Sequence, residues 1–163
     1  MSLDVDIVIQ LSIDRFMSKY MELALAEARI AFSKGEVPIG AVIVKDDKVI
    51  AKAHNLKEEK QSAVAHAEIL CIDEASKVLG TWHLDDCELY VTIEPCAMCS
   101  GAIINSRIKK VYYGASEAKF GAHNSVVNVL GNDKFNHLVE VESGILSEEA
   151  AGLMKSFFKL LRK

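Results

Sequence analysis

Two short stretches decide what this chain can become: His66-Ala67-Glu68 and, across a predicted strand, Pro95-Cys96-Ala97-Met98-Cys99. His66 offers an imidazole nitrogen. Cys96 and Cys99 are three residues apart, so on a helix their thiols share one face. Pro95 suits the first position of that helix. The helix dipole and the free N–H groups of a first turn favour thiolates, which are the form that binds zinc.

These residues predict a zinc site with three protein ligands, His66, Cys96 and Cys99. A catalytic zinc site has three protein ligands and keeps a position for water, whereas a structural site has four. Glu68 lies two residues after His66 and is free to carry protons, because the other three residues complete the protein's share of the ligands. We therefore predict one catalytic Zn²⁺ per chain, with Glu68 as the catalytic residue.

Two other interpretations of the cysteine pair stay open at this point. A Cys-x-x-Cys pair can be redox-active, although no thioredoxin-like unit surrounds this one. It can also be half of a structural zinc site, which needs a fourth ligand. The sequence offers several candidates for that ligand: Cys71, Cys87, His54, His83, His123 and His137.

Composition places the chain among ordinary globular proteins. Its 163 residues are enough for one domain with a proper core, and 50% of them are hydrophobic. A formal net charge of −4 argues against general nucleic-acid affinity, so a polyanionic partner would have to meet a local basic patch. Four cysteines without an export signal indicate a reducing cytoplasm, and no apolar run reaches the length of a membrane span.

Hydrophobic periodicity predicts an α/β fold. A helix from Phe16 to a stop at Gly35 is followed by a hairpin with its turn at Asp46-Asp47, and later strands alternate with helices. The hairpin requires antiparallel strands and the strand–helix–strand crossovers favour parallel ones, so we expect a mixed sheet with helices on both faces. The predicted strands are 41–44, 48–54, 89–93, 110–114 and 139–141. The later helices are 66–79 with Gly80 as its cap, 96–105, and one capped by Ser147.

Two stretches are harder to assign. Residues 1–15 are an uncertain extension ahead of a single domain at 16–163, and 3–9 alternates partly like a strand. This extension could be a leader, an alternative start or a cloning remnant. The segment 116–136 is long for a loop within a domain, so it is either functional or contains an unrecognised helix.

Longer stretches carry a family resemblance over about Phe16 to Lys163. The His-x-Glu and Pro-Cys-x-x-Cys pattern is the signature of the cytidine-deaminase-like zinc superfamily. The stretches 99–102, 106–108 and 157–159 resemble the tRNA-editing branch, the bacterial tRNA-specific adenosine deaminases. Further matching stretches are 35–42, Asn55, 65–69, 89–96 and 135–137.

The resemblance implies a fold, a reaction and partners. The fold would be a cytidine-deaminase-like three-layer α/β/α sandwich with about five strands in a mixed sheet. The reaction would be zinc-dependent hydrolytic deamination of adenosine to inosine at the wobble position (34) of a tRNA anticodon, usually in the arginine tRNA with anticodon ACG. A homodimer in the cytoplasm, acting on the anticodon stem-loop, is the expected form. Asn55 would hydrogen-bond the flipped base, although the residues alone favour a turn role for it.

RNA contacts are expected from the substrate-facing loop and from the C-terminal helix. The candidates are Glu117, Lys119, Phe158, Lys159 and Arg162. Aromatic rings could stack on splayed bases and cations could meet phosphates, but Phe158 could equally belong to the core and the cations to an ordinary helix end. The chain departs from the family pattern around the expected substrate channel rather than at the metal, at Val64-Ala65, Glu117, Phe120 and His123-Asn124.

Two rival functions remain. A deaminase of a free nucleobase or nucleoside, such as guanine or cytosine, would keep the same zinc, glutamate and fold. A non-catalytic RNA-binding module stabilised by zinc would need four protein ligands.

Overall fold

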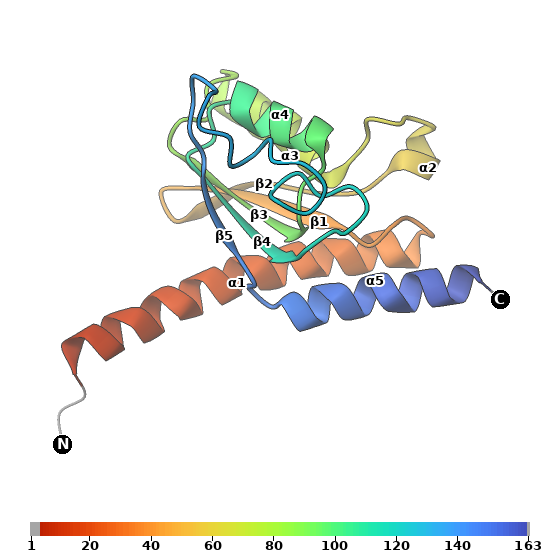
Figure 1. The fold of residues 1–163 in the computed structure, drawn as a ribbon, viewed down its shortest axis with the longest axis horizontal. Coiled ribbons are helices and arrows are strands. Elements are labelled where there is room, and N and C mark those ends of the chain that lie inside the picture. The colour runs from red at the N-terminus through yellow and green to blue at the C-terminus, as the bar shows by residue number, and fades with distance from the viewer. Residues whose placement is uncertain (1–3, 163) are drawn as a thin grey trace.

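A five-stranded sheet in the order β2-β1-β3-β4-β5 forms the middle layer of the computed structural model, which describes residues 4–162 (Figure 1). β1 pairs antiparallel with β2 and β3, whereas the β3–β4 and β4–β5 pairs are parallel. The predicted mixed sheet is therefore confirmed. The strands are β1 Gly40–Lys45, β2 Lys48–His54, β3 Cys87–Ile93, β4 Lys110–Ala115 and β5 Glu140–Ser143.

Helices cover both faces of the sheet and complete three layers. α3 and α4 lie on one face, and α1 and α5 lie side by side on the other (Figure 1). The helices are α1 Val5–Ser33, α2 Lys57–Lys60, α3 Ala67–Leu79, α4 Ala97–Asn105 and α5 Ser147–Leu161. Within residues 4–162, none of these helices has both the length and the apolar composition that crossing a membrane requires.

The alternation of side chains in β1 shows how one strand serves two cores. Ala41 and Ile43 pack with buried residues of α3 and α4, whereas Val42 and Val44 pack with buried residues of α1. Successive side chains of a strand point to opposite faces, so a run that is apolar at every position belongs between two helical layers.

The strand-like pattern at 3–9 was misleading. Asp4 accepts a hydrogen bond from the N–H of Asp6 (3.1 Å) and caps α1, which begins at Val5. The first part of α1 projects beyond the sheet, and its apolar side chains are exposed, as with Val5 at 69% (Figure 1). A helix with apolar residues on all sides and no partner cannot be distinguished from a strand by periodicity. Residues 1–3 lie outside the described part of the chain.

Three predicted helix ends can be checked directly. Gly80 ends α3 with a φ of +68°, which confirms the predicted cap. Pro95 is not the first residue of α4, because the helix begins at Ala97 and its N-cap is Cys96. Ser147 is the first residue of α5 rather than its cap, and Leu146, with a φ of +52°, precedes it. The segment 116–136 contains turns and isolated bridges but no helix.

Gly40 sets the distance between α1 and the sheet. A Cβ atom at this position would lie 2.0 Å from the backbone oxygen of Ala24 and 2.5 Å from the backbone nitrogen of Ala28. Both atoms belong to the α1 backbone, so neither can move away without shifting the helix.

We expect Gly40→Ala to lower the free energy of unfolding by about 3 kcal/mol, because overpacking against a backbone cannot be relieved locally. Gly152→Ala in α5 is the matched control, since nothing lies within 4 Å of its added Cβ. That variant should keep or slightly raise stability. Urea unfolding of both variants checks the prediction, and equal midpoints would contradict it.

Candidate metal centre and active site

The first residues of α3 and α4 bring the predicted ligands together. His66 is the N-cap of α3, Cys96 is the N-cap of α4, and Cys99 lies in the first turn of α4. The Nδ1 atom of His66 is 3.7 Å from the Sγ atom of Cys96 and 3.5 Å from that of Cys99. The three ligand atoms all lie within 4.8 Å of one another.

These distances fit a tetrahedral metal ion. Zinc bonds of about 2.0–2.1 Å to nitrogen and about 2.3 Å to sulfur place the two ligand atoms about 3.6 Å apart at a tetrahedral angle. The distances of 3.5 and 3.7 Å from the His66 Nδ1 atom to the two Sγ atoms lie on either side of this value. A site with one imidazole and two thiols also favours zinc, because magnesium and calcium bind oxygen ligands instead. The residues present therefore fit a zinc ion.

The candidates for a fourth ligand have other surroundings. His54 pairs with Glu27, and His83 with Asp85. The Nδ1 atom of His123 is 3.0 Å from the Tyr113 hydroxyl, and the Nε2 atom of His137 is 2.8 Å from the oxygen of Ile108. Cys71 and Cys87 are buried in the core. Among residues 4–162, only His66, Cys96 and Cys99 form such a group, which leaves one coordination position open.

The ligands interact electrostatically even without a cation. Hydrogen bonds from Cys99 and His66 lower the pKa of Cys96 to about 4. The same contact with the Cys96 thiolate raises the pKa of Cys99, and a hydrogen bond to Cys96 raises that of His66. Cys96 is thus the ready anionic ligand, and a cation must displace a proton from Cys99, so metal affinity should rise with pH.

Glu68 stands next to the ligands in a different environment. It is the second residue of α3, only 4% exposed, and burial raises the pKa of its carboxyl to about 7. A carboxyl group with a pKa near neutrality can both accept and donate a proton, which is the property of a general acid–base residue.

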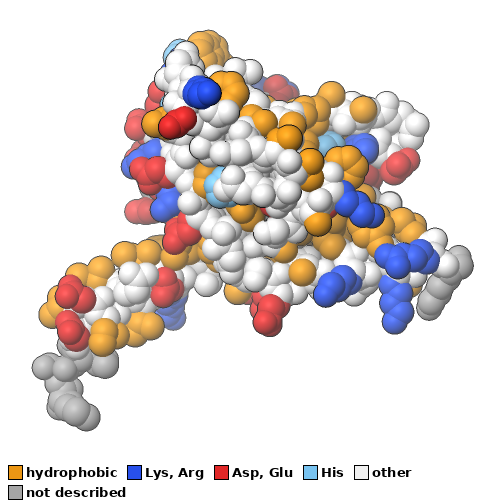
Figure 2. Space-filling view, viewed as in Figure 1, with side chains coloured by type: hydrophobic (Ala, Val, Ile, Leu, Met, Phe, Trp, Pro, Cys, Tyr) orange, Lys and Arg blue, Asp and Glu red, His pale blue; other side chains and the backbone are white. Residues whose placement is uncertain are grey.

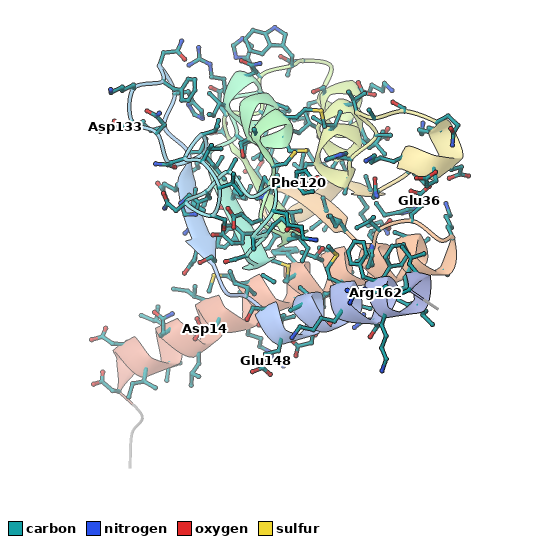
Figure 3. All side chains as sticks on the ribbon, turned by 45° about the vertical axis from the view of Figure 1, so that its right-hand side comes forward. Asp14, Glu36, Phe120, Asp133, Glu148 and Arg162 are labelled. Carbon is teal, nitrogen blue, oxygen red and sulfur yellow. The ribbon has the colours of Figure 1, made fainter. Side chains whose placement is uncertain are left out.

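Asn55 lies between β2 and α2 and is 4% exposed. Its N–H donates to the oxygen of Ile39 (3.1 Å), and its Oδ1 accepts from the N–H of Lys57 (3.4 Å). The side chain thus closes the turn after β2, and its contact with a base stays a prediction. Glu36, labelled near α2 in Figure 3, accepts the N–H groups of Glu58 (3.2 Å) and Glu59 (2.7 Å) and so holds the same turn.

The predicted loop residues lie beside the ligands. Gly121 forms an isolated bridge with Cys96, which brings Lys119 and Phe120 close to the metal helix. Lys119 is exposed, and Phe120, labelled in Figure 3, is 70% exposed. The Glu117 carboxylate accepts the N–H of Lys119 (2.9 Å), so this predicted RNA-contacting side chain also shapes its own turn.

The structure places the remaining predicted RNA contacts on α5, on the opposite face of the sheet from α3 and α4. Phe158 is 37% exposed and packs edge-on against Phe157, while Lys159 and Arg162 are exposed. Lys and Arg side chains gather at the lower right of Figure 2, where Figure 1 shows α5. α5 ends on the same side of the molecule as α2, and contact between these residues and RNA stays a prediction (Figure 1).

Sequence reasoning missed two buried acids, Glu36 and Glu94, which are 1% and 3% exposed. Both occur in stretches that matched the family, but neither was assigned a role. The available signal was an acidic residue next to an apolar one, Val37 after Glu36 and Ile93 before Glu94. A carboxylate is buried only where donors meet it.

In metal-free protein, we expect Glu68→Gln to raise the free energy of unfolding at pH 8. Ionised Glu68 is disfavoured in the folded state, because its pKa there is about 7, above the ordinary 4.5 of a glutamate carboxyl. The free-energy cost of ionising Glu68 in the folded protein grows as the pH rises between these two pKa values. Above them it is constant at about 3 kcal/mol. The advantage of the variant should therefore fall below about 1 kcal/mol at pH 5. Urea unfolding at both pH values checks this, and an equal difference at the two would refute it.

Comparisons with known proteins agree with this geometry. The family model for MafB19-like deaminases matches residues 16–162. A tRNA-specific adenosine deaminase of Bacillus subtilis (strain 168) is 53% identical over 144 residues, which are 88% of this chain and 89% of that protein.

Two solved structures share the fold. One comes from a study of A-to-I editing by tRNA:A34 deaminases and has a TM-score of 0.80 at 45% identity, covering 83% of this chain and 98% of that one. A guanine deaminase of Bacillus subtilis is 42% identical with a TM-score of 0.60, but covers only 63% of this chain and 69% of its own. The fold is thus that of the cytidine-deaminase-like enzymes, and the chain belongs to the family of the tRNA-specific adenosine deaminases.

Proposed function

We propose that this protein is a zinc-dependent hydrolase that converts adenosine 34 of a tRNA anticodon to inosine. The observation that supports this most directly is the group of His66, Cys96 and Cys99 beside the buried carboxyl of Glu68. The 53% identity to a tRNA-specific adenosine deaminase over 88% of the chain supports the choice of substrate. The arginine tRNA with anticodon ACG is our first candidate.

His66, Cys96 and Cys99 would hold the metal. When bound, zinc would supply an activated water by lowering the pKa of that water to about 7. Two thiolates and one neutral imidazole leave the site without excess positive charge, and both helix N-termini favour the anionic ligands.

Glu68 would move the protons of the reaction. Overall, water adds at C6 of adenosine and ammonia leaves, so one proton must reach the ring nitrogen N1 and another the departing amine. The Glu68 carboxylate accepts one proton from the attacking water and delivers it to N1. It then accepts the second proton from the hydroxyl formed at C6 and delivers it to the amine, which leaves as ammonia while a C6 carbonyl forms. Its burial, at 4% exposure, keeps bulk water away from the exchange.

Asn55 and the exposed residues of the loop would bind the RNA. The amide of Asn55 is fixed by the turn after β2 and would hydrogen-bond the flipped base. Glu117, Lys119 and the α5 residues Phe158, Lys159 and Arg162 would contact the anticodon stem-loop. Exposed cations and aromatic rings suit phosphates and unstacked bases.

A guanine deaminase activity is the second candidate, because a guanine deaminase shares 42% identity with this chain. That structure covers 63% of the chain, against 83% for the editing deaminase. The difference in coverage favours the tRNA substrate.

We also propose a homodimer in the cytoplasm. Exposed apolar side chains surround the candidate metal site, among them Val64 (54%), Met98 (37%) and Val126 (54%). A second copy of the chain would cover them. A reducing cytoplasm would keep the two ligand thiols free. Light scattering should give twice the mass of one chain, and a monomer at micromolar concentration would contradict the proposal.

The main test is inosine formation at position 34 of an anticodon stem-loop. Zinc-loaded protein should convert an A34 stem-loop, and Glu68→Gln should reduce kcat by about 10³-fold, because it removes the general acid–base group. The variant should still hold one zinc per chain and still bind the stem-loop.

Two further arms separate the alternatives. Ammonia release from free guanine, without inosine in the stem-loop, would establish the nucleobase activity instead. Unchanged function in Glu68→Gln, with a fourth protein ligand on zinc, would indicate the non-catalytic RNA-binding module.

A further inference from the structure

Glu94 is a buried carboxylate whose hydrogen-bond donors come from one loop. It follows β3 directly, is 3% exposed, and its own N–H donates to the oxygen of Ala115 (2.8 Å) at the end of β4. Its Oε1 accepts the N–H of Glu117 (3.1 Å) and the hydroxyl of Ser125, and its Oε2 accepts the N–H of His123 (2.8 Å). A buried charge needs such partners, so Glu94 and this loop depend on each other.

The loop wraps around Glu94 and returns to the metal helix. The N–H of Ala122 donates to the oxygen of Pro95 (2.9 Å), and Gly121 bridges Cys96. Gly121 has no space for a side chain, because an added Cβ would lie 2.4 Å from the Oε2 of Glu94 and 2.5 Å from the oxygen of Glu117. The carboxylate therefore fixes how close the loop comes to the zinc ligand.

The fixed loop presents groups that suit RNA. Lys119 and Phe120 precede Gly121 and are exposed, so a cation and an aromatic ring stand at the rim of the metal site. An exposed ring beside the reacting position can stack on a splayed base, provided that its backbone is held in place.

We propose that Glu94 is a positioning residue for RNA binding. Its carboxylate holds residues 116–125 against Cys96 and so places Lys119 and Phe120 for the anticodon bases that flank the reacting adenosine. This inference rests on the proposed function. It assigns Glu94 to the affinity for RNA, whereas Glu68 serves the chemical step.

The test uses zinc-loaded Glu94→Gln. Glutamine keeps the shape but turns one acceptor into a donor that faces a backbone N–H or a hydroxyl donor. KM for the A34 stem-loop should rise about tenfold or more, with a smaller change in kcat and one zinc per chain retained. Glu140→Gln makes the same change at an exposed carboxylate on β5 and should leave KM unchanged.

Two loop variants keep the proposal testable if Glu94→Gln does not fold. Gly121→Ala displaces the loop from Glu94 and should also raise KM, while Ser125→Ala removes one of three donors and should raise it less. Unchanged KM in Glu94→Gln would overturn the proposal, and if Glu94→Gln does not fold, unchanged KM in Gly121→Ala would overturn it. Loss of zinc from Glu94→Gln would also overturn it, because Glu94 would then support the metal helix rather than the loop.

Amide hydrogen exchange separates this inference from the proposed function. Exchange at Glu117 and His123 should become faster in Glu94→Gln whether or not the protein edits RNA. Wild-type protein that forms no inosine refutes the proposed function, and the positioning role for RNA with it, even if exchange becomes faster. Active wild-type protein, together with a variant of faster exchange and unchanged KM, refutes the positioning role alone.

Discussion

One imidazole nitrogen and two sulfur atoms lie within 4.8 Å of one another because α3 and α4 begin at the same point beside the sheet. Each helix contributes its N-cap residue to this group, and neither cap side chain forms a hydrogen bond that closes its own helix. The unpaired N–H groups of both helices remain near the ligands, where they stabilise negative charge. The rest of the fold serves to keep these two helix starts together.

Two buried acids hold segments of the chain near the site. Glu36 and Glu94 are buried carboxylates, and each accepts two backbone N–H groups, Glu36 from α2 and Glu94 from the loop after β4. Glu36 holds the turn after Asn55, and Glu94 holds the segment after β4. A carboxylate that meets backbone donors on both oxygens fixes a loop more firmly than neutral hydrogen bonds do. The two acids therefore give the site rigid sides without adding charge to its opening.

Local patterns predicted the layers and the grouping of His66, Cys96 and Cys99. The apolar run in β1 and the turn at Asp46-Asp47 depend on neighbours in sequence, and the structure has them where they were expected. This grouping could be predicted because a spacing of three residues in a helix fixes one common face, and because His66 had only one cysteine pair of that kind to join. That the three residues hold zinc stays a prediction. Helix ends were less certain, since Leu146 adopts a positive φ that its residue type does not suggest.

The roles of Glu36 and Glu94 could not be predicted from residue types, because all but one of the hydrogen-bond donors to their carboxylates are backbone N–H groups 22 to 29 residues away. Every residue except proline has such an N–H, so the partner leaves no pattern in the sequence. The projecting start of α1 escaped prediction for the opposite reason, since no tertiary contact there selects between helix and strand. A sequence therefore reveals sites that are built from particular side chains, such as the group of His66, Cys96 and Cys99. The segments that we propose to contact RNA are held by hydrogen bonds to buried acids, and these hydrogen bonds become visible only in the folded chain.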